Sequence, residues 1–294
     1  MEYTIAKKKY LKDWDDWNRV AVKIYYESKT QDAIVEVENL ISIISNFFEF
    51  KQKIYDMRIL DVGAGWGRHT LELYKRGFKK ILAIDSSPLM KKLFERELSK
   101  VTVDPGIPIP SYIQDDFMNL KTDDEFDLIL VLWSMFGTCD NDEENFAFLK
   151  KSAEVLKCGG RLVIETILWD RLCKLFDCFI NVNSVFTFDV PSSQIRHWEK
   201  RYWDGQEWLI LGAMSLSEKE KVLRYSLFEW VISDSQLVVE SSGASGTISL
   251  RYYELRELIG MLSDAGFIIE RVYGPLLNPE NFYDTRITMI AKKL

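Results

Sequence analysis

The sequence has little of what a metal centre or a disulfide framework requires. Its 294 residues include four cysteines and two histidines, and no two cysteines have Cys-x-x-Cys spacing. Structural zinc sites use cysteine and histidine ligands at short, regular spacings. We therefore expect this protein to hold no metal.

Long apolar runs and a secretory leader are also missing. The longest apolar run, residues 128–133, is far shorter than the roughly 20 residues of a membrane-spanning helix. The basic residues Lys7, Lys8 and Lys9 lead into Trp14 and Asp15 rather than into an apolar segment, so they do not resemble a secretory signal. We expect a protein of the reducing cytoplasm that has no membrane partner.

Positively charged residues are also fewer than negatively charged ones. The chain carries 38 Lys and Arg against 45 Asp and Glu, a formal net charge of -7. A chain this acidic is repelled by phosphate backbones, so nucleic acid is not an expected partner. Aromatic residues, in contrast, make up 13% of the chain and include nine tryptophans. Such a surplus fits either a well-filled core or a pocket for a flat or cationic ligand.

Short apolar runs alternate with helical patterns along most of the chain. The expected strands are residues 58–62, 80–84, 112–113, 126–132, 160–166, 267–272 and 287–291, and the expected helices are residues 66–75, 88–99, 143–156 and 254–265. A further helical segment runs from residue 32 to about residue 50. The alternation predicts right-handed βαβ crossovers. The expected fold class is α/β, with a seven-stranded, Rossmann-like, mostly parallel sheet and helices on both of its faces.

The pattern changes after residue 166. Residues 194–202 and 206–211 flank Trp203-Asp204-Gly205, and Asp-Gly between apolar runs is a strong hairpin signal. Residues 221–232 and 237–240 have the composition of further strands. We therefore expect three parts: an N-terminal helical cap (residues 1–54), an α/β core (residues 55–168 and 251–294) and an antiparallel β insertion (residues 169–250).

A glycine-rich turn follows the first expected strand of the core. Gly63, Gly65 and Gly67 alternate with Ala64 and Trp66, which lets the backbone turn sharply beside the start of a helix. A dinucleotide fingerprint would place its third glycine at residue 68, which is arginine. This departure disfavours a nicotinamide-dependent oxidoreductase. A zwitterionic amino-acid group would instead need a tight turn with a carboxylate nearby, and Asp61 supplies one.

Polar residues follow the next three expected strands. Asp85 lies eighteen residues after Gly67, where an acidic side chain can accept hydrogen bonds from two ribose hydroxyls. The third strand leads to a carboxylate for an adenine amino group and to an aromatic side chain for its ring. The fourth strand ends beside the same crevice. The residues expected to bind the cofactor at these strand ends are Asp85, Ser86, Asp115, Asp116, Phe117, Leu132 and Trp133.

Four segments, in order, resemble class I S-adenosylmethionine-dependent methyltransferases. They are residues 60–69, 84–87, 115–117 and 155–162, and the resemblance extends over nearly the whole chain. Cys158 stands where the family has proline, and Trp66 replaces a small residue. The resemblance implies S-adenosyl-L-methionine as cofactor, bound also by Asp61, Gly63, Ala64, Gly65, Gly67 and Tyr25, with S-adenosyl-L-homocysteine as product. It also implies that the β insertion is a substrate lid.

The expected activity is methyl transfer to a small molecule or a short modified peptide, with nitrogen favoured over oxygen as acceptor. Methyl transfer from a sulfonium needs alignment rather than a catalytic triad. The candidate catalytic residues are Tyr25, His197 and Glu165, and the candidate substrate-binding residues are Trp133, Trp169, Asp170, Tyr253 and Tyr26. The alternative function is a non-catalytic, cofactor-binding scaffold or partner subunit. We expect a monomer or a homodimer.

Purely structural roles remain open for most of these candidates. Tyr25 and Tyr26 fit helix packing as well as they fit a cover over the cofactor. Glu165 and Asp170 fit solvated surface charges. For three tryptophans of the insertion, core filling is the favoured role: Trp198, Trp208 and Trp230.

Overall fold

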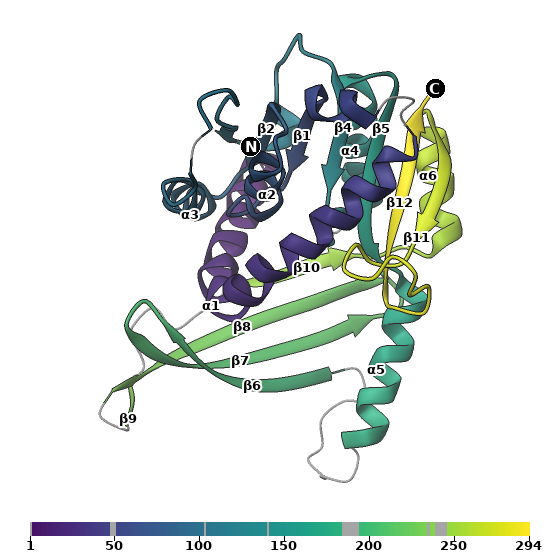
Figure 1. Ribbon diagram of the computed structural model, residues 1–294. Coiled ribbons are helices and arrows are strands. Elements are labelled where there is room, and N and C mark those ends of the chain that lie inside the picture. The colour runs from purple at the N-terminus through teal and green to yellow at the C-terminus, as the bar shows by residue number, and fades with distance from the viewer. Residues whose placement is uncertain are drawn as a thin grey trace. The chain divides into compact units, whose positions relative to one another are not determined.

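The computed structural model describes residues 2–47, 51–102, 104–139, 141–183, 194–233, 236–238 and 246–294 (Figure 1). The chain forms two compact units. The insertion unit consists of residues 1–28 and 169–252, and the core unit consists of residues 29–168 and 253–294. The cap expected at residues 1–54 is thus divided between the two units. Each unit is described by itself below.

The core unit contains a seven-stranded sheet with the order β11-β12-β5-β4-β1-β2-β3. Strands β1 to β5 pair in parallel, whereas β12 is antiparallel to both β5 and β11. The sheet confirms the expected α/β class. Its strands are β1 (Arg58–Val62), β2 (Lys80–Asp85), β3 (Ser111–Gln114), β4 (Phe126–Val131), β5 (Leu156–Ile167), β11 (Phe267–Tyr273) and β12 (Arg286–Lys293).

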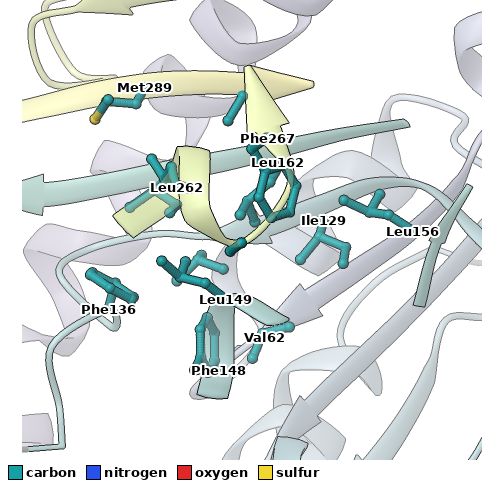
Figure 2. Packing of buried hydrophobic residues seen from close by; sticks show 14 of the residues in the cluster. Val62, Ile129, Phe136, Phe148, Leu149, Leu156, Leu162, Leu262, Phe267 and Met289 are labelled. Atoms are coloured by element: carbon teal, nitrogen blue, oxygen red, sulfur yellow. The ribbon is translucent and has the colours of Figure 1, made fainter. Parts of the chain in front are cut away.

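Strand β4 shows how the two faces of this sheet are covered. Successive side chains of a strand point to opposite faces. Ile129 and Val131 therefore belong to one buried cluster, with residues of α4 (Asp142–Val155) and α6 (Leu255–Asp264), as Figure 2 shows for Ile129, Leu149 and Leu262. Leu128 and Leu130 belong to a second cluster, with residues of α1 (Glu2–Ser45) and α2 (Arg68–Lys75). Helices thus cover both faces, as the sequence predicted.

The strand order reverses between β1 and β4. From β1 the chain continues to β2 and β3 on one side, and it later returns to β4 and β5 on the other side. In open α/β sheets, ligands bind where the order reverses in this way. The connections at this edge include α3 (Pro88–Leu98) and the short 3-10 helix η2 (Phe117–Asn119), and another 3-10 helix, η1 (Lys51–Asp56), precedes β1.

Helix α1 is longer than the sequence pattern indicated. It has 44 residues and begins at Glu2, whereas the pattern predicted a helix from residue 32. In its first half the buried side chains of Trp17, Val20, Ala21 and Ile24 follow helical spacing. That stripe is interrupted by charged residues, which hid it from the sequence analysis. Within the described ranges, none of the helices has the length and apolar character needed to cross a membrane.

The insertion unit holds an antiparallel sheet with the order β10-β8-β7-β6, and β9 also pairs with β8. Its strands are β6 (Gln194–Trp203), β7 (Gln206–Ser217), β8 (Val222–Ser233), β9 (Gln236–Val238) and β10 (Thr247–Arg251). The expected hairpin is confirmed, because Asp204 and Gly205 form the β6–β7 turn with positive φ angles. Residues 239 and 240 of the last expected strand lie outside the described residues.

Two features of the insertion correct the sequence analysis. Residues 169–183 form helix α5 (Trp169–Asn183), so an all-β assignment for residues 169–250 is wrong at its start. The buried residues Trp169, Leu172 and Phe176 follow helical spacing, which is the signal that the analysis missed. Strand β10 was also not predicted.

A buried ion-pair cluster joins α1 to α2 within the core unit. The Arg68 guanidinium donates to the Glu36 carboxylate, and His69 Nε2 lies 2.8 Å from Glu36 Oε2. Burial alone would raise the pKa of Glu36, but hydrogen bonds and charges from His69 and Arg68 outweigh it and lower this pKa to about 2. His69 therefore has a structural role, because its ring contacts a buried carboxylate of another helix.

We expect Glu36→Gln to lower the free energy of unfolding at pH 7 by about 3 kcal/mol, because it leaves a buried guanidinium without its counter-charge. A carboxylate with a lowered pKa stabilises the folded state above its unfolded pKa, and this contribution is lost as the pH falls towards the folded value. The difference between variant and wild type should therefore shrink between pH 4.5 and pH 2. Urea unfolding at several pH values measures it.

The matched control is Glu38→Gln, which changes an exposed residue of the same helix. It should leave the free energy of unfolding within about 0.5 kcal/mol of wild type. A Glu36→Gln deficit of the same size at pH 7 and pH 2.5 would contradict the assignment.

Candidate active site

The glycine turn between β1 and α2 has a backbone that side chains would disrupt. Gly63 and Gly67 have φ angles of 67° and 75°, in the left-handed region that favours glycine. A Cβ at Gly63 would lie 2.3 Å from Met135 Cγ, and one at Gly67 would lie 2.3 Å from Phe94 Cδ2. The turn is thus fixed both by its conformation and by the side chains packed on it.

Asp85, at the end of β2, is bonded directly to this turn. Its carboxylate accepts a hydrogen bond from Gly65 N at 2.9 Å and another from Ser87 N at 2.9 Å. Its side chain is half-buried rather than enclosed. A half-exposed carboxylate beside a glycine turn at this edge can accept hydrogen bonds from ribose hydroxyls.

Tyr112 of β3 also contacts the turn, and the sequence analysis missed it. Its hydroxyl donates to the Gly65 carbonyl at 2.8 Å, and its ring packs on Phe94 with centroids 4.7 Å apart. Burial raises the pKa of Tyr112, with further contributions from Asp85 and Asp61, so the phenol stays protonated and able to donate. The residue lies in a predicted strand, but no sequence pattern indicated which group it would reach.

Asp61 lies beneath the turn. Its carboxylate is 2% exposed and accepts a hydrogen bond from Thr70 Oγ1 at 2.6 Å. Burial raises the pKa of Asp61, although His69, Thr70 and Arg68 act in the opposite direction. The side chain therefore braces the first turn of α2, and a contact to a cofactor ammonium stays a prediction.

The residues after β3 form a small hydrogen-bonded loop next to Asp85. Asp115 N donates to the Asp85 carbonyl at 3.1 Å, and the Asp116 carboxylate accepts from Met118 N at 2.9 Å. Ser86 is exposed on the same edge. Phe117 is buried and packs on Phe148 of α4, with ring centroids 5.0 Å apart. Phe117 is thus a core residue, and its contact with an adenine ring stays a prediction.

Leu132 and Trp133 lie in the turn directly after the carboxyl end of β4. Leu132 is buried, and the Trp133 ring lies under the Arg68 guanidinium, with 5.8 Å from Cζ to the ring centroid. Glu165 of β5 accepts a hydrogen bond from Trp133 N at 3.1 Å. With 1% of its surface exposed, Glu165 is not a solvated surface charge.

The insertion unit contains a chain of hydrogen-bonding side chains. The Tyr25 and Tyr225 hydroxyls are 3.1 Å apart, the Tyr225 hydroxyl is 3.5 Å from His197 Nε2, and that nitrogen is 3.4 Å from Glu199 Oε1. Burial raises the pKa of both Tyr25 and Tyr225. Two residues singled out from the sequence, Tyr25 and His197, thus meet through Tyr225, which the sequence analysis missed.

The remaining substrate candidates are scattered. In the insertion unit, Tyr26 packs edge-on against Trp203 with centroids 5.1 Å apart, Trp169 is buried in the first turn of α5, and Asp170 is exposed there. In the core unit, Tyr253 is buried, and its hydroxyl donates to Asp142 Oδ1 at 2.9 Å.

One expected core residue of the insertion is on the surface instead. Trp198 is 59% exposed and stacks on Trp230, with centroids 5.5 Å apart. Core filling is therefore the wrong role for Trp198. Successive side chains of its strand point alternately to an exposed and to a covered face. The position of Trp198 in this alternation, and not its residue type, therefore determines its exposure.

Comparisons with known proteins agree with this geometry. Residues 59–160 match the family described as a methyltransferase domain. The chain is similar in structure to an S-adenosylmethionine-dependent methyltransferase from Clostridium acetobutylicum, with a TM-score of 0.55 and 18% identity over 88% of this chain and 91% of that one. It is also similar to an amino pentose methyltransferase from Micromonospora echinaspora, involved in calicheamicin biosynthesis and bound to S-adenosylmethionine, with a TM-score of 0.60 and 16% identity over 92% and 96% of the two chains.

A third similar structure is a sugar N-methyltransferase from a Streptoalloteichus species, with a TM-score of 0.63 and 16% identity over 92% of this chain and 91% of that one. No curated protein sequence matches the chain significantly. The fold is that of the class I methyltransferases, and residues 59–160 are its methyltransferase domain. A methyltransferase domain therefore lies within a chain whose fold is shared with S-adenosylmethionine-dependent methyltransferases.

We expect Asp85→Asn to weaken binding of S-adenosylhomocysteine by about 10- to 100-fold, the range set by roughly 1.5–3 kcal/mol for a hydrogen bond to a charged group. The amide keeps one acceptor oxygen and turns an NH2 group towards an amide N–H. Titration calorimetry measures the dissociation constant. The control is Asp123→Asn, an exposed carboxylate on the loop before β4, and unchanged affinity in Asp85→Asn would contradict the assignment.

Proposed function

We propose that the protein is an S-adenosylmethionine-dependent methyltransferase and that it transfers the methyl group to a nitrogen of a small molecule or a short modified peptide. The observation that carries the methyltransferase part of the proposal is the bonding of Asp85 to the glycine turn at the reversal point of the sheet, where a cofactor ribose would be held. Two proteins of similar structure, an amino pentose methyltransferase and a sugar N-methyltransferase, support a small nitrogen acceptor.

Methyl transfer from a sulfonium depends on binding and alignment of the acceptor more than on acid–base groups. The bound cofactor supplies a methyl group on a sulfonium, whose departure leaves a neutral thioether. The chain's own residues then have to hold the acceptor in line and exclude water, and such orientation supplies on the order of 7–11 kcal/mol. An amine with a pKa near 10 costs about 4 kcal/mol to deprotonate at pH 7. An alkyl hydroxyl, such as that of a sugar, is a much weaker acid and costs more to deprotonate, which favours nitrogen over an alcohol oxygen.

The hydrogen-bonding chain of the insertion unit supports a role in acceptor binding. Tyr25 and Tyr225 stay protonated because burial raises the pKa of each phenol, and half-exposed His197 continues the chain. Phenol and imidazole groups can both donate to and accept from an amino sugar or a peptide amine. We therefore assign acceptor binding to Tyr25, Tyr225 and His197. The roles of Trp169, Asp170, Tyr26 and the lid stay predictions.

A panel of amines, amino sugars, short peptides and phenols, incubated with S-adenosylmethionine and the purified protein, should yield a product one CH2 group heavier by mass spectrometry. Amines should react in preference to phenols. Cofactor binding without any methylated product across the panel would favour the alternative function, a non-catalytic scaffold or partner subunit. Preferential methylation of phenols would refute the nitrogen assignment.

With an acceptor found, Tyr225→Phe should raise its KM about tenfold, the equivalent of one lost hydrogen bond of roughly 1.4 kcal/mol, and leave the affinity for S-adenosylhomocysteine unchanged. Steady-state kinetics and calorimetry measure the two quantities. Tyr202→Phe is the control, because Tyr202 is an exposed tyrosine of the same sheet. Equal KM values for the two variants would contradict the assignment of Tyr225.

A further inference from the structure

The turn after β4 has an unusual backbone for its residues. Met135 N donates to the Leu132 carbonyl at 3.2 Å, and the two central residues, Trp133 and Ser134, have φ angles of 53° and 61°. Positive φ at both central positions is typical of a type I′ turn, which Asn-Gly normally forms. A side chain with a Cβ costs roughly 1–2 kcal/mol in this region. Trp133 and Ser134 are therefore both strained.

Glu165 accepts hydrogen bonds from the amides of both central residues of this turn. Glu165 Oε2 accepts from Trp133 N at 3.1 Å, and the Glu165 carbonyl accepts from Ser134 N at 2.9 Å. Its other carboxylate oxygen, Oε1, accepts from Leu276 N at 2.9 Å. Charge-assisted hydrogen bonds of this kind are about twice as strong as neutral ones. Glu165 thus joins the strained turn to the segment between β11 and β12.

The strained turn packs on the cofactor turn. The Met135 side chain fills the space that a Cβ at Gly63 would need, with 2.3 Å between Cγ and that position. The Trp133 ring lies against the Arg68 guanidinium, and Arg68 is the first residue after Gly67. The two contacts reach both ends of the glycine turn. A shift of the β4 turn would therefore move side chains on both of them.

We propose that Glu165 is a positioning residue for the cofactor site. Its carboxylate keeps the backbone from Leu132 to Met135 left-handed. This backbone conformation holds the side chains of Trp133 and Met135 against the glycine turn that binds S-adenosylmethionine. Strained residues persist where the surroundings hold them, and they gather at functional sites. Both oxygens of the carboxylate are bonded to backbone amides, so Glu165 acts through the turn instead of binding a substrate ammonium. The proposal rests on cofactor binding at this site.

Glu165→Gln tests the proposal, because glutamine keeps the shape but has one acceptor oxygen for two amides. We expect S-adenosylhomocysteine to bind about tenfold more weakly by calorimetry on folded protein. A residue that only stabilised the fold would lower the unfolding temperature and leave this dissociation constant unchanged. That result would overturn the proposal.

Two second-site variants separate turn strain from other effects. Glycine adopts positive φ without strain, so Ser134→Gly in the Glu165→Gln background should recover about fivefold of the lost affinity. Ser134→Ala is the matched control, because alanine also removes the hydroxyl but keeps the Cβ. It should recover nothing. Equal recovery by both variants would overturn the proposal.

The remaining outcomes are also decisive. If Glu165→Gln does not fold alone, the comparison is made between the two double variants, of which only the glycine variant should bind with restored affinity. If none of the Glu165→Gln proteins folds, Glu165 serves global stability and the proposal fails. Wild-type protein that binds neither S-adenosylmethionine nor S-adenosylhomocysteine would refute the cofactor site itself, which is a different failure.

Discussion

The left-handed backbone between β1 and α2 is the constraint on which the rest of the core unit depends. Where Gly63 and Gly67 lack side chains, Met135 and Phe94 occupy the space. The turn after β4 and helix α3 therefore both rest on the same five residues. Because protein interiors are closely packed, these elements cannot shift separately. We therefore expect three features to depend on one another: binding at this turn, the packing of α3 and the position of the β4 turn.

Carboxylates around the turn divide into two kinds. Glu36, Asp61 and Glu165 are almost fully buried, and each is bonded to side-chain or backbone donors of the neighbouring elements. A buried charge costs several kcal/mol unless it is paired in this way. Asp85 is the half-buried one, and it touches the turn from the edge where the cofactor's ribose is expected. Burial thus separates carboxylates that brace the site from one that can meet a ligand.

The sequence was sufficient for the sheet but not for the long-range contacts. Buried parallel strands are continuous apolar runs between glycine-rich turns and helices, so β1, β2 and β4 were recognisable, and Asp85 followed from its place at a strand end. Charged residues hid the first half of α1, because they interrupt its buried residues, Trp17 and Val20 included, and one of them, Lys23, is itself buried. The contact between Glu165 and Leu276 spans 111 residues, and the one between Tyr25 and Tyr225 spans 200. Such pairings depend on the packed fold, and no local pattern encodes them.

Strand β12 lies between β5 and β11, although it follows both in the chain. During synthesis β5 therefore waits with an unpaired edge while the insertion, α6 and β11 emerge. An open edge of this kind is a template for pairing with other chains. Pairing of segments so distant in sequence is also intrinsically slow. The order of this sheet thus leaves the β5 edge open to other chains until β12 has been synthesised.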